Sequence, residues 1–368
     1  MKKIVYKPID SALAFLLAIF FQVVLLLGFT IFLALYSGFT GTVLQDVIYS
    51  NLGRILTIIL AEGAFLLVFV LLNFFKQYDG ITAAKINKPF SWQNLVVCIV
   101  IALVVLFGFL GIANLIDMLV TLIGYPVVSE LPLPLTNFWW LLLSIFLFAI
   151  LPAIAEEVLF RGIILTGFLS LGRKKAVLFS ALLFMLIHGN IQQTFYQFLF
   201  GIILGIIFIK TASLWCVIVA HFVNNLVVIL FQYFTQNVPV EIAEFSVSQL
   251  VWAFVTAAIS FVAIYLLFKL LKKAKRKTKQ KFVEDPISGN LVLESEITQD
   301  IPVGISFNQD LSIKVHSIAE EKNKFNNLED SAKIKEKMTY NTKALLYFGF
   351  GLSVLIWISD LVTEITST

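Results

Sequence analysis

Charge is what this sequence has least of. Charged residues make up 14% of its 368 residues, against about 25% in a typical soluble domain. Half of them fall between Lys272 and Lys343, so the rest of the chain is almost uncharged. Hydrophobic residues make up 59%, and the mean hydropathy is +0.93. A soluble fold has no means of hiding that much apolar surface, so the composition predicts an all-α polytopic membrane protein with one polar insert.

Cysteine is almost absent too. Cys98 and Cys216 are the only two cysteines, and both stand in apolar runs, so the sequence predicts no disulfide framework. The basic N-terminus precedes an apolar run longer than the roughly 7–15 residues of the apolar region in a cleaved signal peptide. We therefore expect a first span that is retained.

Long apolar runs fill most of the chain. About 20 mainly apolar residues are needed to cross some 30 Å of hydrocarbon. The sequence offers nine candidates, of which the fifth and sixth are short: 11–36, 55–75, 94–124, 138–168, 175–190, 195–210, 213–234, 247–271 and 344–363.

Basic residues gather in every second loop between these runs. They are Lys2, Lys3 and Lys7, then Lys76, Lys85 and Lys88, then Arg173, Lys174 and Lys175, then Lys210, and finally seven residues between Lys272 and Lys281. The loops in between are acidic or nearly uncharged. Because cytoplasmic loops carry the excess of Lys and Arg, we predict about nine helices with the N-terminus inside and the C-terminus outside.

The polar insert, residues 272–343, is then expected in the cytoplasm. Its start, KKAKRKTKQK, would follow the membrane surface, where each basic residue near an anionic leaflet contributes about 1 kcal/mol. An ordinary basic flank is favoured over a specific binding site. Further on, NLVLESEI and GISFNQDLSIKV alternate like short strands, and residues 320–337 are charged and helix-prone. The insert is the candidate site for a cytoplasmic protein partner.

Ionisable and amide side chains are rare inside the spans, and each is a candidate for function because it is costly to keep there. Glu62 and Asn73 lie in the second span, and Asn114 and Asp117 lie in the third. The fourth to seventh spans hold the dense set, which consists of Glu156, Glu157, Arg161, His188, Asn190, His221, Asn224 and Asn225. The remaining histidine, His316, falls in the insert and is expected to be solvated.

The spacing in PAIAEEVLFRG separates two glutamates that are adjacent in sequence. Glu157 and Arg161 are four residues apart on one helical face, close enough to pair. Glu156 points about 100° away from that pair. Pro152 removes one helical hydrogen bond and is expected to kink or open the helix.

Depth in the membrane predicts that residues from three spans meet. Counted from the nearest basic residue at 1.5 Å per residue, Glu156, His188 and His221 lie about 25, 20 and 16 Å deep. Each residue also has a structural explanation: the glutamates could be partners of Arg161, a lone histidine can be a packing element, and Asn225 could be a polar contact between helices. All these explanations together, at matching depth, are the weaker interpretation.

The runs AEEVLFRG, FMLIHGN and AHFVNN contain, complete and in order, the patterns EExxxR, FxxxH and HxxxN. They resemble the three motifs of the CPBP intramembrane protease family, which groups CAAX-type prenyl-protein endopeptidases with bacteriocin-processing and self-immunity proteins. The sequence has none of the other intramembrane protease signatures, which are HExxH, GxGD and GxSG. We expect five parts: helices 1–3 (1–136), the catalytic core (137–235), helix 8 (236–271), the insert (272–343) and helix 9 (344–368).

The resemblance implies a glutamate-dependent endopeptidase. Amide hydrolysis needs a water, a base that takes its proton, and donors for the developing oxyanion. The implied roles are general base for Glu156, water-holding for His188, oxyanion donation for His221 and Asn225, and orientation of the site for Glu157 and Arg161.

Zinc chemistry is the mechanistic alternative. Glu156, His188 and His221 would supply the three protein ligands of an open zinc site. His221 and Asn225, however, resemble an oxyanion pair more than a ligand and its spacer, and asparagine is a poor zinc ligand. We therefore expect no metal and no other cofactor.

The substrate follows from no motif. The usage of Lys, Ile, Asn and Phe suggests a bacterial, multi-pass protein of the plasma membrane, where bacteriocin or pheromone maturation, or self-immunity, is favoured over cleavage of prenylated proteins. The expected partners are the lipid bilayer and a membrane-associated peptide or protein, and no nucleic acid. The alternatives are a non-proteolytic scaffold, regulator or immunity protein that binds a partner, for instance through 272–343, and, more weakly, a transporter.

Overall fold

The computed structural model describes residues 2–88, 90–122, 124, 133–236, 246–272, 282–284, 291–293 and 338–367. The chain divides into two units, Met1–Ala274 with Lys335–Thr368, and Lys275–Ile334. The described residues of the second unit form an antiparallel pair of strands, β1 (Phe282–Glu284) and β2 (Leu291–Leu293). β2 lies in the predicted strand NLVLESEI, whereas the predicted strand at 304–315 and the predicted helix at 320–337 lie outside the described residues.

The first unit is built from helices at all nine predicted spans. They are α1 (Pro8–Thr40), α3 (Asn51–Lys76), α5 (Trp92–Leu122), the helical segment 138–171, α9 (Arg173–Ile187), α10 (Thr194–Thr211), α11 (Leu214–Thr235), α12 (Val247–Leu270) and α15 (Tyr340–Ser367). Two short helices, α2 (Leu44–Ile48) and α4 (Gly80–Ala83), lie in the connections.

An all-α polytopic membrane protein is thereby confirmed. Within the described ranges, seven helices are long and apolar enough to cross a membrane. α9, with 15 residues, and α15 are not among the seven, so the count of nine spans and their orientation remain predictions.

The segment 138–171 changes its helical type along its length. It runs through α6 (Phe138–Ile145), a π-helical stretch η1 (Phe146–Ile150), α7 (Leu151–Glu157), a second π-helical stretch η2 (Val158–Leu165), α8 (Thr166–Phe168) and η3 (Leu169–Leu171). Pro152 lies at the start of α7, directly after η1. The opening of the helix expected at this proline therefore takes the form of a π-helical turn, a feature that is frequent at functional sites.

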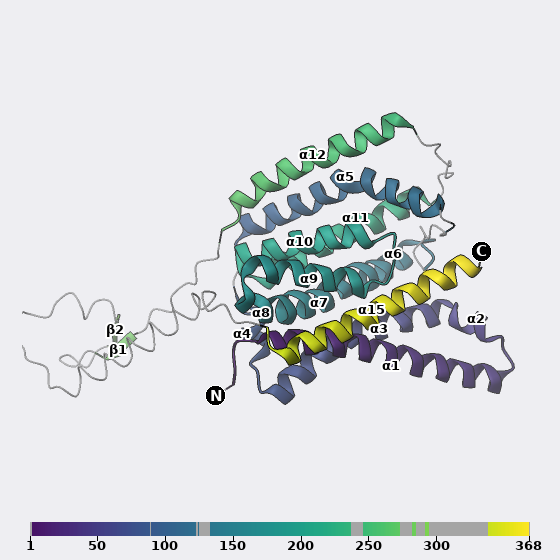
Figure 1. Ribbon diagram of the computed structural model, residues 1–368, viewed down its shortest axis with the longest axis horizontal. Coiled ribbons are helices and arrows are strands. Elements are labelled where there is room, and N and C mark those ends of the chain that lie inside the picture. The colour runs from purple at the N-terminus through teal and green to yellow at the C-terminus, as the bar shows by residue number, and fades with distance from the viewer. Residues whose placement is uncertain are drawn as a thin grey trace, which may run out of the picture. The chain divides into compact units, whose positions relative to one another are not determined.

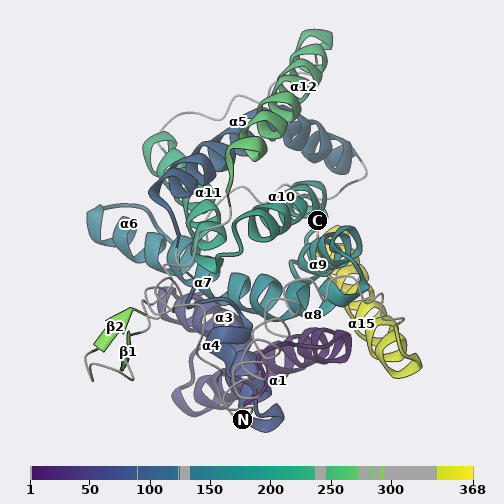
Figure 2. The same cartoon turned by 90° about the vertical axis from the view of Figure 1, so that its left-hand side faces the viewer.

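The helices of the first unit lie side by side, with α5 and α12 at one edge and α1 and α3 at the other (Figures 1 and 2). α7 contacts α3 and α11, and η2 contacts α1, α3, α9, α10 and α11. The motif-bearing segment is thus enclosed by helices on several sides, which explains why its polar side chains are buried.

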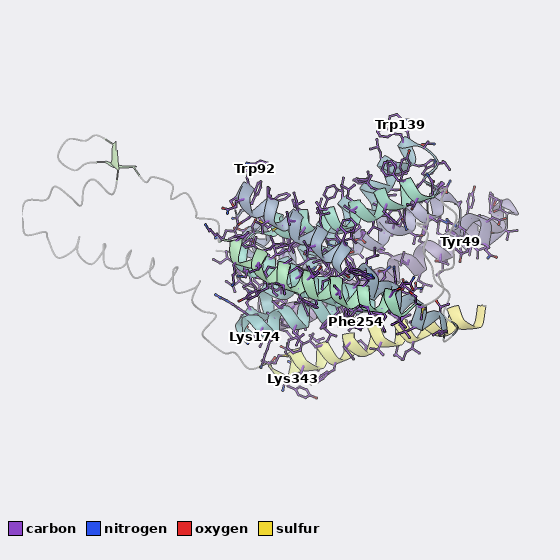
Figure 3. The ribbon with its side chains drawn as sticks, turned by 90° about the horizontal axis from the view of Figure 1, so that it is seen from above. Tyr49, Trp92, Trp139, Lys174, Phe254 and Lys343 are labelled. Carbon is purple, nitrogen blue, oxygen red and sulfur yellow. The ribbon has the colours of Figure 1, made fainter. Side chains whose placement is uncertain are left out.

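The outward faces of the edge helices are apolar. Phe20 and Phe32 on α1, and Val251, Phe254 and Phe261 on α12, are all exposed (Phe254 is labelled in Figure 3). A membrane helix needs such a face toward lipid, because its backbone groups are satisfied internally and its outer side chains meet hydrocarbon.

Residues from the predicted cytoplasmic loops meet at one end of the first unit. The Lys3 carbonyl accepts from the Asp79 amide at 2.8 Å, and Asn94 Nδ2 donates to the carbonyl of Lys272 at 2.7 Å. Figure 3 shows Lys174 and Lys343 toward one end, and Tyr49 and Trp139 toward the other. Basic residues that are far apart in sequence therefore share one end, as the predicted orientation requires.

Reporter fusions test the orientation. A reporter fused after Lys281 is expected to read cytoplasmic and one fused after Thr368 extracytoplasmic, because one span separates them in the predicted topology. Reporter activity measured on both sides of the membrane decides this. Two fusions on the same side would remove α15 from the set of spans or change the count before it.

Candidate active site

Glu157 lies at the centre of a buried cluster of charges. Its Oε1 accepts a hydrogen bond from Arg161 Nη1 at 2.8 Å and lies 2.8 Å from Nδ1 of His221. Arg161 also donates from Nη2 to the carbonyl of Gly201 at 3.2 Å, and its guanidinium lies 4.5 Å from the ring centre of Phe184. The side chains of Glu157 and Arg161 have no exposed surface. The predicted pair is present, and His221 joins it.

The contact with Glu157 fixes the proton position on His221. The carboxylate oxygen, which also accepts from Arg161, has no hydrogen to give, so we assign the hydrogen in this contact to Nδ1 of His221. A neutral His221 then has a lone pair at Nε2 and accepts there; the imidazolium form donates from Nε2 as well. Donation to an oxyanion by His221 therefore requires its protonated form.

Glu156 faces His188 rather than the Glu157 cluster. His188 caps α9, and its Nδ1 lies 2.7 Å from the carbonyl of Phe184. A carbonyl only accepts, so the hydrogen lies on Nδ1 and a neutral His188 has a lone pair at Nε2. Nε2 is 3.9 Å from Glu156 Oε2, too long for a hydrogen bond. Glu156 is 7% exposed, and its Oε2 is buried without a hydrogen-bond partner in the protein.

Asn225 bonds to the helix that carries the glutamates. Its Nδ2 donates to the carbonyl of Phe148 at 3.0 Å. In a regular α-helix this carbonyl would bond the amide of Pro152, which has no hydrogen. Asn225 Oδ1 accepts from Nδ2 of Asn224 at 3.2 Å, and the hydroxyl of Tyr196 donates to Oδ1 of Asn224. An amide group carries two donor hydrogens, so Asn225 has a second one to offer.

Residues 138–227 match a family described as Rce1-like, type II CAAX prenyl endopeptidase Rce1-like. The chain carries a CAAX-protease family domain. The match confirms the resemblance that the three motifs predicted, since all three motifs lie within these residues. No curated protein and no solved structure matched the chain.

The CAAX-protease domain brings the predicted site residues together. Glu156 with His188, and Glu157 with Arg161 and His221, form two adjoining groups, because the two glutamates are consecutive on α7. The sixth predicted residue, Asn225, contacts the same helical segment about two turns before the glutamates. Asn190 lies apart in the α9–α10 loop, where its Oδ1 accepts from the Gln192 amide at 2.8 Å.

Sequence reasoning missed the contribution of α10. Phe200 meets His221 edge-on at 5.6 Å between ring centres, Tyr196 bonds Asn224, and Gly201 accepts from Arg161. None of the three belongs to a motif. Tyr196 and Phe200 are four residues apart, which places them on one helical face, but a Tyr and a Phe in an apolar run give no signal of their own.

Glu62 is the one acidic residue of the cluster outside the family match. α3 packs against α7, and Phe65, one turn after Glu62, meets Phe160, one turn after Glu156, at 6.3 Å between ring centres. This pairing places Glu62 at the level of Glu156, and the two charges interact. Glu62 Oε2 is buried without a hydrogen-bond partner in the protein. The sequence marked Glu62 as an intramembrane acid but gave it no partner.

The other intramembrane polar residues lie elsewhere. Asn73 Oδ1 accepts from the hydroxyl of Tyr6 at 2.7 Å. Asn114 and Asp117 line a cavity of about 600 Å³ between α5 and α12. They belong to neither of the two groups around the glutamates.

A zinc site does not fit the residues present. In the parts of the chain that the structure describes, no three side chains of His, Cys, Asp or Glu are grouped in a way that could hold a metal ion. The alternative ligand set would need Glu156, His188 and His221 together, whereas His221 turns Nδ1 to Glu157 at 2.8 Å.

Metal independence therefore stays a prediction. Purified protein treated with a strong chelator is expected to keep its rate of peptide cleavage, because the proposed base and donors are side chains alone. Metal content by mass spectrometry and cleavage rate, measured on the same samples, check this. Zinc at one per chain that is lost together with the activity would contradict it.

Proposed function

We propose that this protein is an intramembrane, glutamate-dependent endopeptidase that hydrolyses a peptide bond in a membrane-associated peptide or protein. The observation that carries the proposal is the pair formed by Glu156 Oε2 and His188 Nε2. Two buried acceptor atoms stand 3.9 Å apart, a separation that one water can bridge with two hydrogen bonds of about 2.8 Å.

A water in that position would be oriented for attack. It would donate one hydrogen to Glu156 and the other to His188, which leaves an oxygen lone pair free to face a substrate carbonyl carbon. On attack, Glu156 takes the proton of the water, and the electron pair of the carbonyl bond moves to its oxygen. When the C–N bond breaks, the protonated Glu156 returns the proton to the leaving amine.

The oxyanion would be stabilised from α11. His221, as imidazolium, donates from Nε2, and Asn225 donates its second amide hydrogen. In this state the carboxylates of Glu156 and Glu157 are balanced by Arg161 and His221, which is favourable because an unpaired buried charge is costly. Each such donor contributes on the order of 10²–10³ in rate.

The proposed substrate class follows from the membrane setting. The family description names a prenyl endopeptidase, and its cleavage chemistry requires a substrate that reaches a site enclosed by helices. We propose a multi-pass enzyme of a bacterial plasma membrane that matures a peptide such as a bacteriocin, or confers self-immunity, without a nucleic-acid partner. The composition and the family match support this proposal.

Comparison of protein N-termini in cells tests the function across all membrane-associated proteins at once. Cells that produce the wild type or Glu156→Gln at equal levels are compared after enrichment of N-terminal peptides and mass spectrometry. New N-termini in membrane-associated proteins are expected in the wild type alone. Asp117→Asn, which removes an intramembrane carboxylate facing α12, is the matched control and should behave as the wild type.

Identical N-termini in wild-type and Glu156→Gln cells would contradict the proposal. If the two strains also share the wild-type phenotype, the scaffold or regulator alternative is the better account. Residues 272–343 would then be the first segment to delete.

A further inference from the structure

We infer that Tyr196 is a positioning residue for the proposed hydrolysis, acting through Asn224 to fix which way the amide of Asn225 faces. Asn225 then presents N–H groups, not its carbonyl oxygen, toward Phe148 and the adjoining substrate position. The inference rests on the proposed function and adds two residues to its oxyanion-stabilising part.

The hydrogen bonds form a directed chain. The Tyr196 hydroxyl on α10 donates to Oδ1 of Asn224. With Oδ1 occupied in this way, Nδ2 of Asn224 lies on the opposite side of the amide and donates to Oδ1 of Asn225 at 3.2 Å. Nδ2 of Asn225 in turn donates to the carbonyl of Phe148 at 3.0 Å.

The two ends of the chain allow only one polarity. The carbonyl of Phe148 accepts and never donates, so Asn225 must place Nδ2 there. If Asn224 alone turned by 180°, its Oδ1 would face Oδ1 of Asn225, and two acceptors would meet without a hydrogen. Asn224 is 5% exposed, so water has little access to repair such a mismatch, and a buried unsatisfied group is costly. The Tyr196 hydroxyl supplies the donor that keeps Asn224 in the working orientation.

The aromatic packing holds the hydroxyl in place. The Tyr196 ring stacks on Phe200 at 5.9 Å between ring centres, with the planes at 27°. Phe200 meets the His221 ring edge-on at 5.6 Å. One face of α10 therefore supports both proposed oxyanion donors, His221 by packing and Asn225 by the hydrogen-bond chain.

Kinetics of Tyr196→Phe test the inference. The assay uses purified protein in lipid vesicles and a peptide that spans a cleavage site found in wild-type cells. We expect kcat to fall about tenfold, the factor that corresponds to roughly 1.4 kcal/mol, and KM to stay near the wild-type value. Asn225→Ala should lose more, on the order of 10²–10³. Tyr233→Phe, on α11 two turns beyond Asn225, is the matched control and should keep the wild-type kcat.

A double variant separates positioning from general support of the fold. Tyr196→Phe with Asn225→Ala is expected to be no slower than Asn225→Ala alone, because Tyr196 acts through Asn225. Asn224→Asp, which keeps the shape but loses the donor to Asn225, should lose at least as much kcat as Tyr196→Phe. It is a second route to the same result if the phenylalanine variant folds poorly.

Three results would overturn the inference. They are a wild-type kcat in Tyr196→Phe, a wild-type kcat in Asn224→Asp, and a double variant slower than Asn225→Ala by the full tenfold factor. A wild type that cleaves no peptide while Glu156→Gln has the same set of N-termini overturns the proposed function, and the inference with it.

Discussion

Glu156→Gln is expected to lower kcat/KM by a factor on the order of 10⁴, the upper end of what a general base contributes. Glutamine has nearly the same shape but takes up no proton from water. Glu156 Oε2 has no hydrogen-bond partner in the protein, so the exchange breaks no internal bond, and the thermal unfolding midpoint should stay near that of the wild type. Steady-state cleavage and thermal unfolding of the purified variant check both parts.

Glu157→Gln is the matched control because the two glutamates are neighbours in sequence. The amide oxygen of glutamine can still accept from Arg161 and His221, so this variant is expected to weaken cleavage by positioning alone and to be far milder. Removal of His188 or His221 should resemble Glu156→Gln, and the double variants should be no worse than the singles, because the residues act as one unit. A dead Glu157→Gln beside a mild Glu156→Gln would show that the base is the other glutamate.

Arg161→Ala is expected to destabilise the folded protein by about 3–5 kcal/mol, the cost of breaking a buried ion pair from one side. Glu157 would keep its charge in a position without exposed surface, and the carbonyl of Gly201 would lose a donor. Thermal unfolding in detergent and the amount of inserted protein measure this loss. Cleavage by the remaining folded protein should also fall, since Glu157 would no longer hold His221 in a fixed position.

The double variant Glu157→Gln with Arg161→Ala shows whether the cost comes from the unpaired charge. We expect it to be little worse than either single change, because both singles lose one shared interaction. A double variant destabilised by the sum of the two single changes would mean that Glu157 and Arg161 act independently, which the 2.8 Å contact between them does not allow.

Features set by the regular geometry of one helix could be predicted from the sequence. The four-residue spacing of Glu157 and Arg161 gave their pairing, and the constant rise per residue gave the common depth of Glu156 and His188. The motif resemblance added the enzyme class. The first and last residues of the apolar runs fall within a few residues of the helix ends, because hydrophobic length alone defines a span.

Features set by the rotation of one helix against another could not be predicted. The contact of His221 with Glu157 and the bond from Tyr196 to Asn224 each join two helices, and no pattern within either helix encodes which faces meet. Glu62 shows the same limit, since its position opposite Glu156 depends on how α3 packs on α7. The number of spans depends on α9, whose 15 residues fall short of the roughly 20 that a perpendicular span needs.

Cleavage by the purified protein in lipid vesicles tests most directly the claim that Glu156 activates a water for peptide hydrolysis. The substrate is a peptide spanning a cleavage site found in wild-type cells, and products are identified by mass spectrometry after chelator treatment. The wild type is expected to cut the peptide at that site, Asp117→Asn to match it, and Glu156→Gln to leave the peptide intact. Cleavage by Glu156→Gln at the wild-type rate would contradict the account.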